Sequence, residues 1–241
     1  MKKSIQPHIM CGLGDVAKYV LIPGDPRRVE VIASFLDEGC KRADYRGFVT
    51  YTGKKDGVDI TICSTGIGCP SAAIAVEELG RIGADTFIRV GSCGVLQEGQ
   101  APGDVVIASG TVRMGGTGNA YLPPMYPAVP TFNVLRKLVE SGEELNIPVT
   151  VGVGSAGDAF YAPYRDPNLS LANLVFVEME SDTLFIVGQV RRWRTGAIFA
   201  SDGGPGNTKP ESGEADFRRG EQNAIKIALG AMWKIAQEDK A

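Results

Sequence analysis

Short apolar runs alternate along this chain with segments whose apolar residues recur every three or four positions. The short runs predict buried β-strands, and they cover residues 19–22, 48–52, 58–63, 86–90, 104–112, 149–155, 174–177 and 197–200. The periodic segments predict amphipathic helices, which begin near residues 26, 70, 131, 180 and 217. Strands that alternate with helices predict an α/β fold. No repeat, low-complexity tract or linker divides the chain, so we expect a single domain over residues 1–241.

Composition and charge narrow the range of partners. The chain has 241 residues, of which 44% are hydrophobic and 22% charged, so it can bury a sizeable core. The net charge is −3 and no basic stripe is present, which argues against nucleic acid as a partner. The apolar runs are too short to cross a membrane, and no signal-peptide pattern follows Met1. Five cysteines without a Cys-x-x-Cys pair favour a reducing, cytoplasmic location.

The segment at residues 89–94, Arg-Val-Gly-Ser-Cys-Gly, is the most informative in the chain. It begins at the C-terminal end of the predicted strand at 86–90, and ligands of open α/β sheets bind in the crevice at that end. Arg89 can point a rigid cationic fork into the crevice and Ser92 adds a hydroxyl, while the glycines let the backbone approach a ligand. The segment predicts an oxyanion site. The alternative is a surface salt bridge at Arg89.

A second candidate for anion binding is the turn at residues 24–28, Gly-Asp-Pro-Arg-Arg. Asp25 can cap the following helix, with Pro26 at its first position. The free N–H groups of the Gly24 turn and of the helix start can hold an anion, and Arg28 adds positive charge. The alternative is a capped helix with solvated arginines. Two strand ends with converging cations strengthen the anion-binding interpretation.

Two acidic segments also follow apolar runs. Residues 178–180, Glu-Met-Glu, join a strand to a helix, where a buried carboxylate can accept the two hydroxyls of a ribose diol. The alternative is an acid that simply favours the helix dipole. Asp202 follows the run at 197–200 beside glycines, where partial burial suits a general acid. The alternative is an ordinary Asp-Gly turn.

His8 and the aromatic pair at residues 160–161 are further candidates. His8 is the only histidine, and histidines near a terminus are commonly solvated. Phe160 and Tyr161 follow a predicted strand, where an aromatic pair can form a wall for a base or pack into the core.

These segments, in this order, resemble the nucleoside phosphorylase-I family. The matching motifs are Gly-Asp-Pro-x-Arg at 24–28, Tyr-Arg-Gly at 45–47, Arg-Val-Gly-Ser at 89–92, Asp-Ala-Phe-Tyr at 158–161 and Val-Glu-Met-Glu at 177–180. Residues 201–203 and 225–230 are most similar to hexameric purine nucleoside phosphorylases of the protozoan-parasite type, which are related to uridine phosphorylases. The resemblance implies a mixed, twisted, partly barrel-like central sheet flanked by helices. It also implies a homo-oligomer, a hexamer assembled as a trimer of dimers.

The resemblance implies a role for each matched residue. Phosphate would be bound by Gly24, Arg28, Arg89 and Ser92, together with Arg46 of a neighbouring subunit. Ribose would be bound by Met179 and Glu180, together with His8 of the neighbour. The base would contact Phe160, Glu178 and Asp202. The catalytic residues would be Arg89 and Asp202, with Asp202 protonating purine N7 as the base leaves. No metal or cofactor is implied, and inorganic phosphate is the co-substrate.

The implied activity is a pentosyltransferase of purine salvage, which converts inosine, guanosine or their deoxy forms and phosphate into free base and ribose 1-phosphate. The alternatives are a uridine phosphorylase, a nucleoside hydrolase and a non-catalytic nucleoside-binding protein. Uridine phosphorylases usually carry Gly-Gln-x-Arg after the aromatic pair, whereas residues 162–165 here are Ala-Pro-Tyr-Arg. The arginines of the predicted phosphate site argue against a hydrolase. Asp182 and the loop at residues 204–213 have no assigned role.

Overall fold

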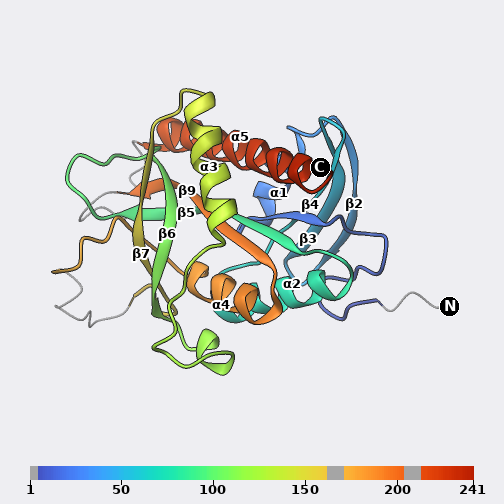
Figure 1. Ribbon diagram of the computed structural model, residues 1–241, viewed down its shortest axis with the longest axis horizontal. Helices are drawn as coiled ribbons and strands as arrows, with labels where there is room; N and C mark the ends of the chain where they lie inside the picture. Colours follow the sequence, from blue (N-terminus) through green and yellow to red (C-terminus); the bar gives the residue numbers. More distant parts are fainter. Residues whose placement is uncertain (1–4, 162–170, 204–212) are drawn as a thin grey trace.

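A nine-stranded sheet runs through the computed structural model, which describes residues 5–161, 171–203 and 213–241. The strand order is β2-β3-β4-β1-β5-β8-β7-β6-β9, and β9 also pairs with β5, so β5, β8, β7, β6 and β9 close into a ring (Figure 1). The strands are β1 (Tyr19–Ile22), β2 (Glu38–Tyr45), β3 (Phe48–Lys55), β4 (Val58–Cys63), β5 (Thr86–Val95), β6 (Val105–Met114), β7 (Val149–Gly157), β8 (Phe176–Glu178) and β9 (Arg194–Gly203). The predicted mixed, partly barrel-like α/β sheet flanked by helices is confirmed.

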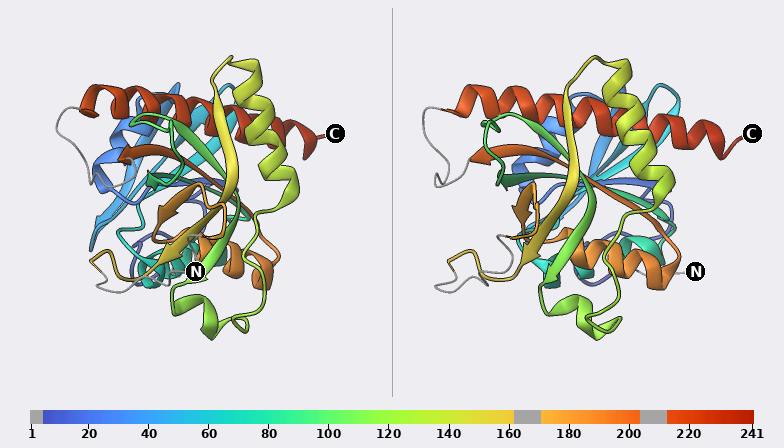
Figure 2. Two further views of the ribbon diagram at one scale, coloured as in Figure 1. Left: turned by 90° about the vertical axis from the view of Figure 1, so that its left-hand side faces the viewer. Right: turned by 60° about the vertical axis from the view of Figure 1, so that its left-hand side comes forward.

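Helices cover the sheet on two sides, with α3 and α5 on one side and α2 and α4 on the other (Figure 2). The helices are α1 (Pro26–Ala33), α2 (Cys69–Arg81), α3 (Phe132–Glu144), α4 (Ser181–Arg191) and α5 (Glu214–Glu238), with a short 3-10 helix, η1 (Thr117–Ala120). Each side has its own apolar core. In β5, Phe87 joins the core of α2 and α4, whereas Ile88 joins the core of α1, α3 and α5. A strand covered on both faces has a continuous apolar sequence, which is why this run predicts a strand correctly.

Strands β5 and β9 extend well beyond their apolar runs. The sequence predicts strands at 86–90 and 197–200, but β5 ends at Val95 and β9 at Gly203. The two strands pair in parallel over nearly their whole length. Arg89 therefore lies inside its strand and not at the C-terminal end, and Asp202 lies within a strand and not after it, which corrects both predictions. The added residues are mostly small or polar and look like a loop in the sequence, because their pairing depends on backbone hydrogen bonds of the closed ring.

Strand β2 is absent from the sequence-based prediction. Seven of its eight residues are exposed, and its sequence shows no alternation of apolar and polar residues. The strand lies at the edge of the sheet, where one side of its backbone needs no partner strand. The sequence pattern identifies strands by burial, so an exposed edge strand leaves no such signal.

Strands β1 and β8 both pair with the same side of β5 but leave a gap between them, and the candidate site lies at this gap. Strand β1 pairs with β5 only as far as Arg89, and β8 pairs with β5 only at Gly94 and Val95. In the described part of the chain, residues 90–93 have no strand partner on that side. The Val90 carbonyl instead accepts a hydrogen bond from Arg28 Nη1 at 3.4 Å. The parting of β1 and β8 thus exposes the backbone of β5 to side chains from α1.

Candidate active site

Arg89 is the centre of the site and is almost fully buried, with 6% of its side chain exposed. Its Nε donates to Glu178 Oε2 at 2.9 Å, and its Nη2 forms an ion pair with Glu180. The third nitrogen, Nη1, is buried and has no hydrogen-bond partner among the described residues. A Cβ built on Gly24 would lie 3.7 Å from Nη1, so this donor faces the Gly24 turn. A buried cationic donor without a partner favours an anionic ligand at that position.

The Gly24 turn is held against the loop that follows β4. Gly66 N donates to the Gly24 carbonyl at 3.0 Å, and Thr65 N donates to the Pro23 carbonyl at 2.9 Å. Asp25 caps α1 through a 2.9 Å hydrogen bond from Arg27 N, as the sequence predicts. Gly24 therefore lies where the C-terminal ends of β1 and β4 meet, beside Arg89 of β5.

The two adjacent arginines of the turn have opposite environments. The Arg27 side chain is 91% exposed and pairs with Asp25, whereas that of Arg28 is 9% exposed and turns inward. Arg28 Nε donates to Glu221 Oε1 at 2.5 Å. The structure thus selects Arg28 over Arg27 as the inward cation, and the predicted contact of Arg28 with phosphate stays a prediction.

The Glu178 carboxylate accepts hydrogen bonds from several groups of the site. Its Oε2 accepts from Arg89 Nε and from Glu180 N, both at 2.9 Å. Its Oε1 accepts from Ser181 N at 2.9 Å and from Ser181 Oγ at 2.7 Å. Four donors thus share its two oxygens, and the carboxylate orients Arg89 and the start of α4. Its predicted contact with a base stays a prediction.

Glu180 lies beside Arg89 at the junction of β8 and α4. Its side chain is 5% exposed, and Gly68 N donates to Oε1 at 2.5 Å. Burial raises the pKa of Glu180, and the positive charge of Arg89 opposes that rise. Met179, beside it, is partly buried. The structure therefore brings the predicted ribose residues Met179 and Glu180 next to the predicted phosphate residue Arg89.

Gly68 and Cys69 are site residues that the sequence analysis did not identify. They begin α2, and Cys69 Sγ donates to the Met179 carbonyl at 3.2 Å and to Asp182 Oδ1 at 2.9 Å. Burial raises the pKa of the Cys69 thiol, which keeps its proton for these contacts. The glycine turn at residues 65–68 is the only signal of this role in the sequence.

Asp182 is fully buried and makes no salt bridge within the described residues. Besides Cys69, its carboxylate accepts from Thr183 N and, at 3.3 Å, from Gly115 N. Burial raises the pKa of Asp182. The residue that the sequence leaves without a role thus joins the first turns of α2 and α4 to the loop after β6.

Asp202 occupies an irregular position in the β5–β9 pairing. Cys93 pairs with Ser201 and Gly94 with Gly203, so Asp202 is the extra residue of a bulge. Bulges change the direction of a side chain, and Asp202 is partly buried, as predicted. Ser201 fixes the strand at this point, because its Oγ accepts from Asp104 N at 3.1 Å and donates to the Ala101 carbonyl. Ser92, on the adjacent strand, is partly exposed.

The other predicted residues are more exposed and, among the described residues, make no hydrogen bond, ion pair or ring contact with Arg89. His8 Nδ1 contacts Glu78 Oε1 at 2.5 Å, and the imidazole is 37% exposed. Arg46 is exposed at the tip of the β2–β3 hairpin, where its φ is +52°. Phe160 is 51% exposed beside Tyr161, with ring centroids 4.9 Å apart.

Two segments that the sequence analysis discussed cannot be placed in this structure. The 162–165 segment and most of the 204–213 loop lie outside the described residues.

The described residues contain no group of three or more His, Cys, Asp and Glu side chains that could hold a metal ion. None of the described helices has the length and apolar character required to span a membrane.

Comparisons with known proteins agree with this geometry. Residues 18–232 match the phosphorylase superfamily. The chain is 42% identical to guanosine phosphorylase of Halorubrum lacusprofundi, over 94% of this chain and 98% of the relative. It is 40% identical to uridine phosphorylase of Thermococcus kodakarensis, over 99% of this chain and 90% of the relative. The crystal structure of Toxoplasma gondii purine nucleoside phosphorylase in complex with immucillin-H superposes with a TM-score of 0.92 at 31% identity, covering 99% of both chains. The chain therefore belongs to the phosphorylase superfamily, among its nucleoside phosphorylases.

Proposed function

We propose that this chain is a purine nucleoside phosphorylase that acts on inosine or guanosine and their 2′-deoxy forms. The observation that carries the proposal is the Arg89 guanidinium. One nitrogen pairs with Glu180, a second pairs with Glu178, and the third is a buried donor that faces Gly24. A single rigid cation thus joins a candidate ribose acceptor to a candidate phosphate site. No cofactor is required, because phosphate itself is the nucleophile.

In the proposed reaction, a phosphate oxygen attacks C1′ as the bond between C1′ and the base nitrogen breaks. Gly24, Arg28, Arg89 and Ser92 hold the phosphate, and the Glu180 carboxylate accepts hydrogen bonds from the ribose hydroxyls. The sugar carries positive charge in the transition state, and both the phosphate and the Glu180 carboxylate stabilise that charge. The protein contributes position and electrostatics and needs no nucleophile of its own.

Asp202 is the basis for proposing a purine substrate. The purine leaves poorly as an anion, so its N7 must gain a proton as the bond breaks. Asp202 is partly buried at the β9 bulge and can donate that proton as a general acid. Uracil has no N7 and would gain nothing from this acid. Uridine phosphorylase is the second candidate, supported by the 40% identity to the Thermococcus enzyme.

The proposed assembly is a homo-oligomer, with a hexamer of three dimers as the expected form. His8 and Arg46 lie on exposed segments and are proposed to complete the ribose and phosphate sites of a neighbouring subunit. All five cysteines are free thiols, which supports a reducing, cytoplasmic location. Neither nucleic acid nor a membrane is a proposed partner.

The test is incubation of the protein with inosine, guanosine, adenosine and uridine, each with and without phosphate. Phosphate-dependent release of hypoxanthine or guanine, with ribose 1-phosphate as co-product, is the expected result. Equal release in phosphate-free buffer would identify a hydrolase. Faster cleavage of uridine than of every purine nucleoside would establish the second candidate.

A further inference from the structure

We propose that Glu221 of α5 is a positioning residue that sets the orientation of Arg28 and thereby the affinity of the site for phosphate. The inference depends on the proposed function, because it assumes that Arg28 binds phosphate. It assigns a role in that site to the C-terminal helix, which contributes none of the residues predicted from sequence.

Three contacts define the orientation of the Arg28 guanidinium. Nε donates to Glu221 Oε1 at 2.5 Å, and Nη1 reaches the Val90 carbonyl at 3.4 Å. The guanidinium carbon lies 6.0 Å from the centroid of the Phe217 ring, within the range of a cation–π contact. Phe217 and Glu221 are four residues apart in α5 and therefore share one helix face. A single face of α5 thus supplies two of the three contacts.

The charge of Glu221 matters because Arg28 is buried. The Arg28 and Glu221 side chains are 9% and 12% exposed, respectively. A buried cation without a counter-charge is costly, so Arg28 would turn towards solvent if Glu221 were absent. The other two contacts are longer and are not made to a charged acceptor. Glu221 is therefore the contact that decides whether the guanidinium stays in the site.

The register of α5 is fixed by an unusually close backbone contact beside Glu221. A Cβ built on Gly220 would lie 2.2 Å from the Gly103 carbonyl oxygen, so only glycine fits there. Gly103 N in turn donates to the Ser201 carbonyl at 2.9 Å. The same turn of α5 thus packs on Gly103, which is hydrogen-bonded to the strand that carries Asp202, and it also holds Arg28. Glu221 cannot shift along the helix axis without breaking that contact.

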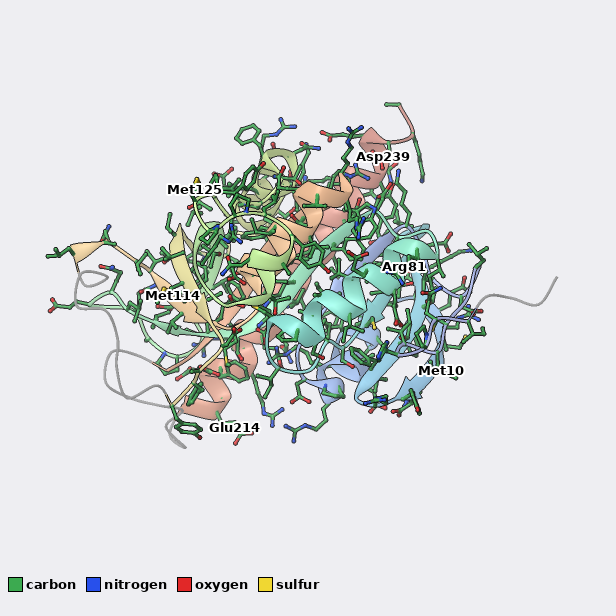
Figure 3. All side chains as sticks on the ribbon, turned by 90° about the horizontal axis from the view of Figure 1, so that it is seen from below. Met10, Arg81, Met114, Met125, Glu214 and Asp239 are labelled. Carbon is green, nitrogen blue, oxygen red and sulfur yellow. The ribbon has the colours of Figure 1, made fainter. Side chains whose placement is uncertain are left out.

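The test compares Glu221→Ala, which removes the acceptor, with Glu221→Gln, which keeps an amide oxygen in place. Glu214→Ala is the matched control, because Glu214 lies at the start of the same helix (Figure 3). Its side chain is 67% exposed. For each variant we would measure the KM for phosphate, the KM for inosine and kcat. Phosphate binding would also be followed directly, as the rise in Tm on addition of phosphate to the nucleoside-free protein.

We expect Glu221→Ala to raise the phosphate KM about tenfold, the lower end for loss of a hydrogen bond to a charged group. The rise in Tm with phosphate should shrink in parallel, while the inosine KM and kcat change little. Glu221→Gln should recover most of the phosphate affinity, and Glu214→Ala should match the wild type.

Two results would overturn the inference. One is an unchanged or lower phosphate KM in Glu221→Ala, which would mean that Glu221 is idle or competes with phosphate for Arg28. The other is an equal loss of kcat and of affinity for both substrates, which would indicate a purely structural role. Arg28→Ala, measured in parallel, separates the assumptions. If Arg28→Ala leaves phosphate binding intact, the proposed phosphate site is wrong; if it weakens binding and Glu221→Ala does not, only the role of Glu221 fails.

Discussion

The predicted site divides into a buried part and an exposed part, and the two are built differently. In the buried part, Arg89, Glu178 and Glu180 each have 6% or less of the side chain exposed and bind one another directly. In the exposed part, His8 is 37% and Phe160 51% exposed, and Arg46 lies at a hairpin tip. The buried residues form a charge network within one chain. The exposed residues present polar or aromatic groups at the protein surface.

The difference indicates how the work of the site is divided. Buried charges must be paired, so their positions are decided when the chain folds. The exposed side chains of Arg46 and Phe160 cost little to leave without a buried partner. His8 contacts Glu78 through Nδ1 but keeps 37% of its imidazole exposed, so all three groups can meet a ligand or a second subunit. The buried part should therefore be intact in every folded chain, whereas the exposed part should depend on assembly. The following predictions test this division.

The largest effect is expected at Asp202. Replacement of Asp202 by Asn removes the proton that the purine N7 needs, and kcat for inosine should fall by ~10²-fold or more, within the range for a general acid. The phosphate KM should change little, because the arginines are untouched. Steady-state kinetics with inosine and phosphate check both statements. Asp59→Asn, on the exposed side of β4, is the matched control. Full inosine turnover in Asp202→Asn would exclude the acid role.

The second effect concerns the shape of the Arg89 side chain. Arg89→Lys keeps one positive charge but loses the three-way fork, so it cannot bind Glu178, Glu180 and phosphate together. We expect the phosphate KM to rise about tenfold to a hundredfold, in keeping with loss of a hydrogen bond to a charged group. Arg89→Lys is preferred to Arg89→Ala, because alanine would leave two buried carboxylates without a counter-charge. An unchanged phosphate KM in a folded Arg89→Lys protein would remove Arg89 from the phosphate site.

The third prediction tests whether the exposed part acts on a neighbour. A chain with His8→Ala and Arg46→Ala is mixed with a Glu180→Gln chain, after dissociation and reassembly. Random pairing should restore roughly a quarter of the wild-type activity, because half of the dimers are mixed and each has one intact site. The control is a mixture of Glu180→Gln with Arg89→Lys, two variants of the buried part, which should not restore activity. No recovery despite verified mixed dimers would place both parts of the site in one chain.

The smallest effect is a dependence on pH. Burial raises the pKa of Glu180, so this carboxylate takes up a proton at a higher pH than an exposed glutamate does. A protonated Glu180 is a poorer acceptor for the ribose hydroxyls, and the inosine KM should rise a few-fold as the pH falls through the raised pKa. A raised pKa also means that the folded chain binds this proton more tightly than the unfolded chain, so the group does not promote acid unfolding. Loss of affinity should therefore precede loss of circular dichroism; the opposite order would contradict the prediction.

The sequence predicts the components of the site better than their positions. The motifs around Gly24, Arg89 and Glu180 carry enough residues to indicate anion and diol binding. They do not show that Arg89 lies in the middle of a ten-residue strand or that Asp202 is the extra residue of a bulge. Both features follow from the way β9 closes the ring onto β5. That pairing is made by backbone atoms, which are the same in every residue and leave no pattern in the side chains.

By itself, the sequence determines the alternation of strands and helices and the capped start of α1, because burial and capping depend on residue type. It also determines the order in which the motifs follow one another along the chain. Only the tertiary structure decides that Arg28 and not Arg27 turns inward, that Glu178 orients Arg89, and that Cys69 contacts Asp182 and the Met179 carbonyl. It also decides that Glu221, 193 positions along the chain from Arg28, is the partner of that arginine. A buried charge requires a partner, but the fold determines which distant residue provides it.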